Sequence, residues 1–434
     1  MHPTALSRCI HLALACGILM LAACGSGGDA SSARRASDAG SPPDSAISKP
    51  DSATLRRARV ASYVGYGLGM FQRMAAARGA RNLFFSPVSA GIAFSLATTG
   101  ATGPTRAELA RALRMPDAPA AIDSANAALV AALRASDVEL RVGTSLWAQE
   151  GAPFLADYLA NARTTFHAEV ADVDFAGPSA AARINAWASR ATAGKIARAV
   201  SADPEPGRVL LLLNAVYFKG KWAHQFDPAL TGPLPFHVNG GAPQPRPTMR
   251  IGGGYRYAAV PGMRALRLPY RGGRFSMVVI LPDSGVTLAS LVAGLTPRRW
   301  AALDSAFAPA PEVEVALPRF ETNGSADLVP PMRALGARRV FHPGQARLGA
   351  MLPAEYLATH RTWISAATQG VYVKVDEEGT EAAAVTSVES VSDSASTGVP
   401  VRFVVDRPFL AAVVDGATGA LLFVGQVYDP AETR

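Results

Sequence analysis

The chain has 434 residues, 49% of them hydrophobic and 18% charged, which is typical of a globular protein and excludes a disordered or fibrous one. Its net charge is +8, carried mostly by arginine, because the chain has only five lysines. The arginines are scattered, and no basic stripe with interleaved aromatic residues accompanies them. We therefore favour a solvated arginine-rich surface and expect no nucleic-acid partner; the alternative is an anionic partner such as nucleic acid or a polysaccharide.

The first residues have the pattern of an export signal. Arg8 precedes an apolar run over residues 10–23, which ends in Leu21-Ala22-Ala23-Cys24-Gly25. This ending resembles the lipobox of bacterial lipoproteins, in which the signal is cut before the cysteine and the new N-terminal thiol is lipidated. The resemblance predicts a signal peptide over 1–23 and a lipid on Cys24. The alternatives are an ordinary cleavage site after small residues and an uncleaved anchor.

The residues that follow predict a tether and then one folded domain. Residues 24–52 consist largely of Gly, Ser, Ala, Asp and Pro, which is typical of a flexible linker. Residues 53–434 show no repeat and no second linker, and they are enough for a core without disulfides. The lipid implies an exported protein anchored in the bacterial cell envelope, at the outer membrane, in the periplasm or on the cell surface. Gly25 gives no inner-membrane retention signal, so we favour the outer membrane.

Helices are predicted before strands. Apolar residues from Val60 to Met74 keep helical spacing, Ser86-Pro87 is typical of a helix start, and Thr105 to Glu108 forms a capping box for a third helix. The nearly all-apolar run 209–218 predicts a central strand buried on both faces. Further strands are expected at 138–148, 265–269, 275–281, 313–320, 371–376, 401–405, 409–414 and 421–427. Helices followed by strands predict an α+β fold with large antiparallel or mixed sheets.

No catalytic constellation is found. The histidines outside the signal show no metal-ligand spacing with one another, and they are His167, His224, His237, His342 and His360. No nucleophile elbow or phosphate-binding glycine loop occurs. Asp376, Glu377 and Glu378 are adjacent, and as strand residues they would point to opposite faces. We therefore expect no enzyme activity, no metal and no cofactor.

The stretch that begins at Glu377 carries the functional hypothesis. From Thr380 to Ser392 the even positions are all small or uncharged, and every charge falls on an odd position. This period of two predicts a strand with one buried face, whereas the Ser, Thr, Ala and Glu composition is typical of a mobile loop. A segment with both properties can be a loop in one state and a paired strand in another. The alternative is a surface loop whose alternation is accidental.

Four motifs together resemble the serpin family. Residues 82–89, Asn-Leu-Phe-Phe-Ser-Pro-Val-Ser, are similar to its Asn-x-x-Phe-Ser-Pro motif, and 214–222 to its central-strand motif ending in Trp222. Residues 406–410 are similar to its C-terminal signature, and 377–384 to the hinge of its inhibitory members. The resemblance implies the serpin fold: N-terminal helices packed on a large central mixed β-sheet plus smaller sheets, with an exposed reactive loop.

The resemblance also implies a mechanism. A serine protease, or in some cases a cysteine protease, cuts the loop and forms an acyl-enzyme, and the cut loop then inserts into the main sheet and distorts the protease. Insertion needs a hinge of small residues, here Glu377, Glu378, Gly379, Thr380, Glu381, Ala382, Ala383 and Ala384. Counting about seventeen residues from Glu377 puts the cut bond at Asp393-Ser394. A shift of one or two residues would present Val391 or Ser392 to an elastase- or subtilisin-like enzyme.

Some further residues acquire roles by the same resemblance. Ser86, Ser89 and Asn214 match the polar shutter beneath the main sheet, and Trp222 lies near the top of that sheet. Gln369 stands where the family usually has a histidine, which implies a modified network. Arg319 is expected to form a salt bridge with Glu377.

The implied function is irreversible inhibition of a protease by a chain that we expect to be monomeric, with elastase-, subtilisin- and aspartate-specific enzymes as candidate targets. One alternative is a non-inhibitory serpin-fold binding lipoprotein. The other, an unrelated envelope hydrolase, would need a nucleophile–base pair, which the sequence does not offer.

Overall fold

The computed structural model describes residues 51–135, 138–201, 207–380 and 400–432. Cys24, the hinge residues Glu381 to Ala384 and the candidate bond residues 391–394 lie outside these ranges. No helix within them is long and apolar enough to cross a membrane. The helices are α1 (Ser52–Arg78), α2 (Pro87–Gly100), α3 (Gly103–Ala112), α4 (Pro119–Arg134), α5 (Ala156–Thr164), α6 (Ala180–Ala191), α7 (Leu288–Ala293), α8 (Pro297–Ala306), α9 (Val329–Ala334) and α10 (Ala354–Thr359).

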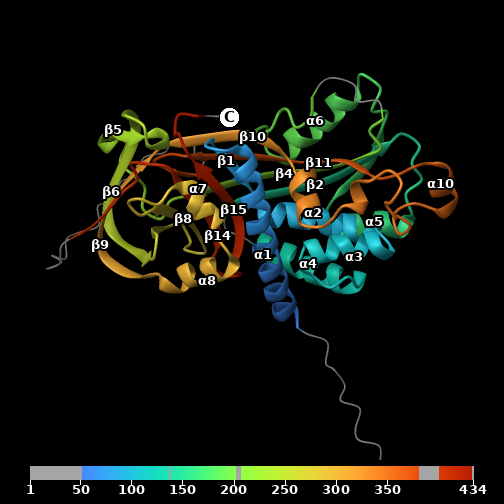
Figure 1. Cartoon of the computed structure of the whole chain (residues 1–434), viewed down its shortest axis with the longest axis horizontal. Helices are drawn as coiled ribbons and strands as arrows, with labels where there is room; N and C mark the ends of the chain where they lie inside the picture. The colour runs from blue at the N-terminus through green and yellow to red at the C-terminus, as the bar shows by residue number, and fades with distance from the viewer. Residues whose placement is uncertain (1–50, 136–137, 202–206, 381–399, 433–434) are drawn as a thin grey trace, which may run out of the picture. The chain divides into compact units, whose positions relative to one another are not determined.

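The strands form two sheets (Figure 1). One sheet has the order β10-β11-β12-β4-β2-β3, and β11 also pairs directly with β4. Its strands are β2 (Glu139–Gln149), β3 (Glu169–Val173), β4 (Leu210–Lys221), β10 (Phe320–Asp327), β11 (Ile364–Val375) and β12 (Gly379–Thr380). The sheet is mixed, because the β11–β4 and β2–β3 pairs are parallel and its other pairs are antiparallel.

The second sheet has the order β1-β15-β14-β8-β7-β6-β9-β13, with β5 paired to β6. Its strands are β1 (Leu83–Phe85), β5 (Gly232–His237), β6 (Pro243–Val260), β7 (Met263–Pro269), β8 (Phe275–Pro282), β9 (Ala308–Pro318), β13 (Val401–Val404), β14 (Phe409–Asp415) and β15 (Ala420–Val427). The expected α+β fold of helices on mixed sheets is confirmed.

Helix α2 is the centre of the packing. All its residues are buried, because it contacts β4 and β2 on one side and α1, α3 and α4 on others. A helix buried on every side is mostly apolar, and its few polar side chains need internal hydrogen-bond partners. Its start is fixed as the sequence predicted: Ser86 is the N-cap, its hydroxyl accepts from the backbone N–H of Ser89, and Pro87 occupies the first turn. Gly67 of α1 lies against this start, where a Cβ would come within 2.3 Å of Pro87.

Strand β4 is central and almost wholly buried, as its apolar run predicted. Its even-numbered residues Leu210, Leu212, Val216 and Phe218 face the main core. Its odd-numbered residues, including Leu213, Ala215 and Tyr217, face a second cluster built on α6. This alternation assigns each face of the six-stranded sheet to a different environment.

Three local predictions were wrong. The helix expected to be capped by Thr105 begins at Gly103 instead, and the Thr105 hydroxyl accepts from the N–H of Arg347. Glu108, the second member of that capping box, binds the backbone N–H groups of Arg338 and Arg339. The run 313–320 is not one strand, because β9 ends at Pro318 and β10 begins at Phe320. Finally, residues 376–378 are a bend after β11 and not part of a strand.

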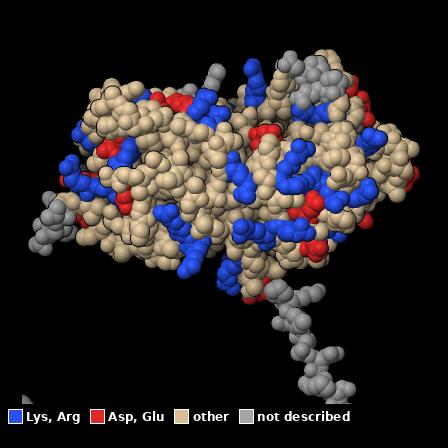
Figure 2. All heavy atoms as spheres, in the orientation of Figure 1, with Lys and Arg blue, Asp and Glu red and all other residues tan. Residues whose placement is uncertain are grey.

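The charged side chains on the face drawn in Figure 2 are spread in several separate groups, with acidic residues between some of them. Part of the positive charge is paired in ion pairs: Arg274 with the buried Asp415 at 2.9 Å, and Arg246 with Asp429 at 2.7 Å. Hydrogen bonds from Arg274 hold the pKa of Asp415 below its ordinary value, although burial alone would raise it. The distribution of charge agrees with the scattered arginines of the sequence.

Candidate functional site

The start of the predicted hinge lies inside the six-stranded sheet. Gly379 and Thr380 form the short strand β12, which is antiparallel to both neighbours: Thr380 stands opposite Val375 of β11 and Gly220 of β4. Below this point β11 and β4 pair directly, from Tyr372 opposite Tyr217 down to Ile364 opposite Leu210. The two strands are therefore already separated at one end, and the first residues of the hinge fill the space between them.

Gly379 has to be a glycine in this arrangement. A Cβ at this position would lie 2.0 Å from the carbonyl oxygen of Gly220 and 2.8 Å from the Cα of Lys221. Both are backbone atoms of the central strand β4 and cannot move aside independently of the sheet. The sequence thus permits the hinge backbone to approach β4 more closely than any residue with a side chain would allow.

Thr380 is fully buried, and its hydroxyl oxygen lies 2.6 Å from the hydroxyl oxygen of the buried Tyr270. Trp222 stacks on the Tyr270 ring at 4.6 Å between centroids. The indole N–H of Trp222 donates to the carbonyl of Asp376 at 2.9 Å, and its backbone N–H donates to the carbonyl of Glu378 at 2.9 Å. Tyr270 and Trp222 together therefore hold the bend and the hinge against the end of β4.

Glu377 forms the salt bridge with Arg319 that the sequence predicted. Its carboxylate accepts from Nε of Arg319 at 2.6 Å and from the hydroxyl of Thr231 at 2.5 Å. Arg319 lies between β9 and β10, so this contact ties the bend to the edge of the sheet. Burial alone would raise the pKa of Glu377, but the hydrogen bonds from Thr231 and Arg319 outweigh burial and lower that pKa.

A second cluster lies where α2 meets β4 and β11, and we call Ser86, Ser89, Asn214 and Gln369 the shutter cluster. Gln369 stands opposite Asn214 across the β11–β4 pair, and its amide N–H donates to Asn214 Oδ1 at 2.7 Å and to the carbonyl of Ser86 at 3.1 Å. Its Oε1 accepts from the N–H of Ser86 at 2.8 Å. The glutamine thus bridges the two strands and the helix start.

Asn214 completes the cluster from the central strand. Its Oδ1 also accepts from the Ser89 hydroxyl at 2.8 Å, and its Nδ2 donates to the carbonyl of Gly143 on β2 at 3.0 Å. The cluster is fully buried, with Gln369 and Ser89 at 0% exposure and Asn214 at 1%. Every polar atom of the Gln369 and Asn214 amides has a partner, which is what burial of such groups requires.

The structure brings the predicted residues into two groups, with Trp222, Arg319, Glu377 and Thr380 in one and the shutter cluster in the other. Sequence reasoning missed Tyr270 and Thr231, which hold Thr380 and Glu377. Neither has a motif of its own: Tyr270 follows the end of β7, and Thr231 lies in the connection before β5. Contacts between segments this far apart leave no periodic signal in the chain.

The three adjacent carboxylates do not converge on one site. Asp376 pairs with Lys374 at 3.1 Å, and Glu377 pairs with Arg319. One carboxylate oxygen of Glu378, Oε2, is buried without a hydrogen-bond partner. Among the described residues, no group of three or more His, Cys, Asp and Glu side chains is placed to hold a metal ion. The contacts of Asp376 and Glu377 hold the bend at 376–378 against the sheet.

A sequence profile of the Serpin (serine protease inhibitor) family matches residues 62–430. The chain belongs to the serpin family. It is 33% identical to human Serpin B9 over 361 residues, which cover 80% of this chain and 93% of that protein. It is 28% identical to an uncharacterized serpin-like protein of the archaeon Methanosarcina acetivorans, over 80% of this chain and 81% of the relative.

Solved structures agree on the fold. Thyroxine-binding globulin in complex with thyroxine superposes with a TM-score of 0.77 at 23% identity, covering 86% of this chain and 99% of that one. Native protease nexin-1 with heparin gives a TM-score of 0.76 at 24% identity, covering 88% and 100%. At this identity the likeness concerns the fold alone.

Proposed function

We propose that this serpin is an irreversible suicide-substrate inhibitor of serine proteases, or of cysteine proteases, and that its cleaved loop inserts between β11 and β4. The observation that carries this proposal is β12: Gly379 and Thr380 already pair with both strands. A loop that continues from β12 into the sheet would extend an existing strand and would not have to start a new one. Its register would follow from the pairing of Thr380 with Gly220.

The register predicts which loop side chains become buried. Continued antiparallel to β4, it brings Ala382 opposite Phe218, Ala384 opposite Val216 and Thr386 opposite Asn214. These residues of β4 belong to its core-facing set, so the small, uncharged even positions of the loop enter the core side. Glu381 and Glu389 fall on the other face, so the alternation in the sequence fits the sheet that must receive it.

Insertion would replace one ladder of strand pairing by two. The direct β11–β4 pairing is parallel, and both new pairings would be antiparallel. A net gain of about a dozen hydrogen bonds at about 1 kcal/mol each gives on the order of 10 kcal/mol. This is comparable to the stability of a whole ordinary domain, about 5–15 kcal/mol, and is enough to drive a large displacement.

The shutter cluster is the barrier in this proposal. Gln369 and Asn214 are joined at 2.7 Å across the line along which the strands would part. Thr386 would enter between them, where its hydroxyl can both donate and accept and so replace the broken contact. Gln369 then has the same function that the family assigns to a histidine, with hydrogen bonds that depend on no titrating group.

The experiment is incubation with elastase-, subtilisin-, trypsin- and aspartate-specific proteases, followed by SDS electrophoresis and mass spectrometry of the released C-terminal peptide. We expect a covalent complex with at least one of these enzymes and cleavage at Asp393-Ser394, with the bonds after Val391 and Ser392 as the alternatives. Cleavage of the loop by every enzyme without a complex would contradict inhibition and favour a non-inhibitory binding protein.

We also propose that the inhibitor is a bacterial lipoprotein, held in the cell envelope by acylated Cys24 with residues 24–52 as the tether. The support is the lipobox-like ending Leu21-Ala22-Ala23-Cys24. Expression in a bacterial host with an alkyne-labelled fatty acid tests it. Label should enter the wild-type chain and not Cys24→Ser, and label in both or in neither would contradict the proposal.

A further inference from the structure

A cavity of about 480 Å³ lies between α1, α9 and two edge strands. Of the described strands, β10 ends the order of the six-stranded sheet and β1 ends that of the nine-stranded sheet. The two strands contact each other, and α1 and α9 supply further lining residues. The volume falls in the range of about 300–1,000 Å³ that is typical of small-molecule sites.

The apolar part of the lining comes from separate elements. Met74 is on α1, Leu83 and Phe84 are on β1, Pro331 is on α9, and Val371 is on β11. The uncharged part of a ligand would therefore contact apolar side chains on several sides of the cavity.

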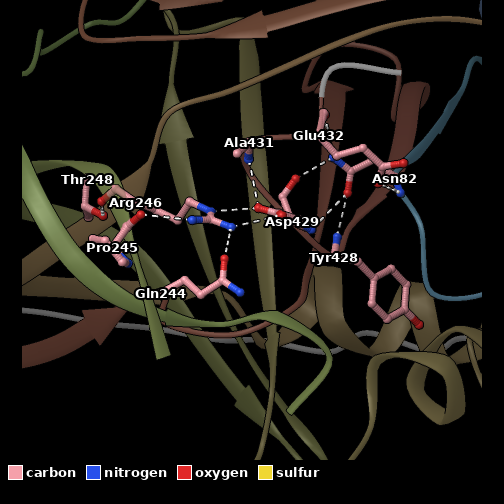
Figure 3. A network of polar contacts seen from close by, with 9 residues as sticks. All are labelled: Asn82, Gln244, Pro245, Arg246, Thr248, Tyr428, Asp429, Ala431 and Glu432. Carbon is pink, nitrogen blue, oxygen red and sulfur yellow. Dashed lines mark hydrogen bonds and ion pairs between the residues drawn. The ribbon is translucent and has the colours of Figure 1, made fainter. Parts of the chain in front are cut away.

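The part of the cavity wall that β1 forms is held in place by Asn82, the residue before that strand (Figure 3). The Asn82 side chain donates to the carbonyls of Asp429 at 2.7 Å and Glu432 at 2.9 Å, and accepts from the N–H of Tyr428 at 2.7 Å. The C-terminal segment thus locks Leu83 beside the cavity. A wall locked in this way is present before any ligand binds, which lowers the cost of binding.

The charged side chains that line the cavity are two arginines and one aspartate. Arg73 and Arg78 lie in the last turns of α1, and neither forms an ion pair with a carboxylate of the described chain. Nη1 of Arg73 donates to the carbonyl of Gly69, and Nε of Arg78 donates to the carbonyl of Asn82. A guanidinium has five N–H donors, so both retain donors for a ligand. Asp327 is the acidic member of the lining, and its Oδ1 accepts from the N–H of Val329.

One polar group of the lining lacks a partner. The hydroxyl of Thr322 on β10 is buried, with the residue 5% exposed, and it has no hydrogen-bond partner among the described residues. A buried hydroxyl without a partner costs about 1–3 kcal/mol. A ligand atom that accepts from or donates to Thr322 Oγ1 would remove this cost.

We propose that this cavity binds a small apolar monoanion, with a carboxylate as the simplest headgroup. The carboxylate pairs with Arg73 or Arg78, the apolar body packs on Met74 and Phe84, and a polar atom reaches the Thr322 hydroxyl. A neutral ligand of the same shape forgoes the charged pairing, and a dianion or a large polyanion does not fit an apolar cavity beside Asp327. The proposal is independent of protease inhibition.

Isothermal titration of the full chain with 1-naphthoate tests the proposal, with neutral 1-naphthamide as the matched ligand. We expect naphthoate to bind at least about tenfold more tightly than the amide. The double variant Arg73→Gln/Arg78→Gln should lose about tenfold in affinity, and Arg57→Gln, an exposed arginine earlier on α1, should lose none.

Two blocking variants keep the test decisive. Gly324 on β10 lines the cavity, and a Cβ there meets no atom within 4 Å, so Gly324→Trp should fold and fill the cavity. Ala334→Trp does the same from α9. Thermal unfolding confirms that each variant is folded. The proposal is overturned if naphthoate shows no saturable binding up to about 1 mM, if the amide binds equally well, or if binding survives both tryptophan variants.

Discussion

The hydroxyl oxygens of Tyr270 and Thr380 lie 2.6 Å apart, and both side chains are completely buried. The contact joins the second sheet's β7–β8 connection to a residue of the reactive-loop hinge. Gly379 and Thr380 thereby lie inside the sheet in the intact molecule. Insertion of the cleaved loop, as we propose it, extends a strand that is already started.

Replacing Thr380 should separate inhibition from cleavage. Thr380 is already fully buried in the intact protein, so Thr380→Arg should force β12 out of the sheet. Insertion would then have to bury the guanidinium again, at a cost of several kcal/mol, and should be slowed at least about a hundredfold. The acyl-enzyme would then be hydrolysed first, and the protease would be released active. Gel densitometry of complex against cleaved inhibitor measures this partition. Thr380→Ser keeps the hydroxyl and should still form complex, and a Thr380→Arg variant that inhibits normally would argue against insertion.

Removing the Gln369 amide should destabilise the intact protein. Gln369→Ala leaves the buried N–H of Ser86 without a partner and takes one donor from Asn214, which should cost about 2–3 kcal/mol of unfolding free energy. Urea unfolding provides the measurement. Gln345→Ala, at an exposed glutamine, is the control and should change stability by less than about 0.5 kcal/mol. Equal unfolding free energies of the two variants would show that the Gln369 amide does not stabilise the intact protein.

The salt bridge of Glu377 predicts a dependence on pH. Its pKa is lowered in the folded protein, so its stabilising contribution is present above the ordinary glutamate pKa of about 4.3 and is lost as the pH falls through the folded value. Glu377→Gln should therefore have a lower unfolding midpoint than the wild type at pH 7, with the difference shrinking below about pH 4.5.

The control for this titration is Glu314→Gln. Glu314 pairs with Arg402 at 3.3 Å, but both side chains are more than half exposed, so little stability should be lost at any pH. A difference between wild type and Glu377→Gln that stays constant from pH 7 to about pH 3.5 would contradict the assigned role of the carboxylate.

Thr386 gives a test that is specific to the inserted state. Thr386→Val keeps the shape and removes the hydroxyl, so the loop-cleaved protein should lose about 1–3 kcal/mol while the intact protein is unchanged. Ser387→Ala removes a hydroxyl from the opposite face and should leave both states unaffected. Unfolding of each variant before and after cleavage measures the effect, and equal losses for Thr386→Val and Ser387→Ala would exclude the proposed register.

The sequence predicted those parts of the fold that depend on local pattern. The apolar run 209–218 marked β4, and Ser86-Pro87 marked the start of α2, because burial and capping impose their own periodicity. The 18-residue strand β6 was missed, since three of its residues are prolines and three are glycines and it alternates poorly. Thr105 was misassigned because its hydroxyl is used by a segment more than two hundred residues away.

The candidate site also contains some contacts that were predicted and others that were not. The ion pair between Arg319 and Glu377 was predicted through the family resemblance and is present. Asp376 to Glu378 were expected in a strand, but the chain bends there so that Gly379 can turn back along β4. The partners Tyr270 and Thr231 depend on how distant segments pack, and a single sequence carries no record of that packing.

The most direct test of loop insertion is the thermal unfolding midpoint of the protein before and after its reactive loop is cut by a protease that forms no complex. A gain on the order of 10 kcal/mol should raise the midpoint by about 10–15 °C in a domain of this size. Thr380→Arg should show a smaller rise. An unchanged or lower midpoint after cleavage would mean that the loop does not enter the sheet, and the inhibitory mechanism would then be wrong.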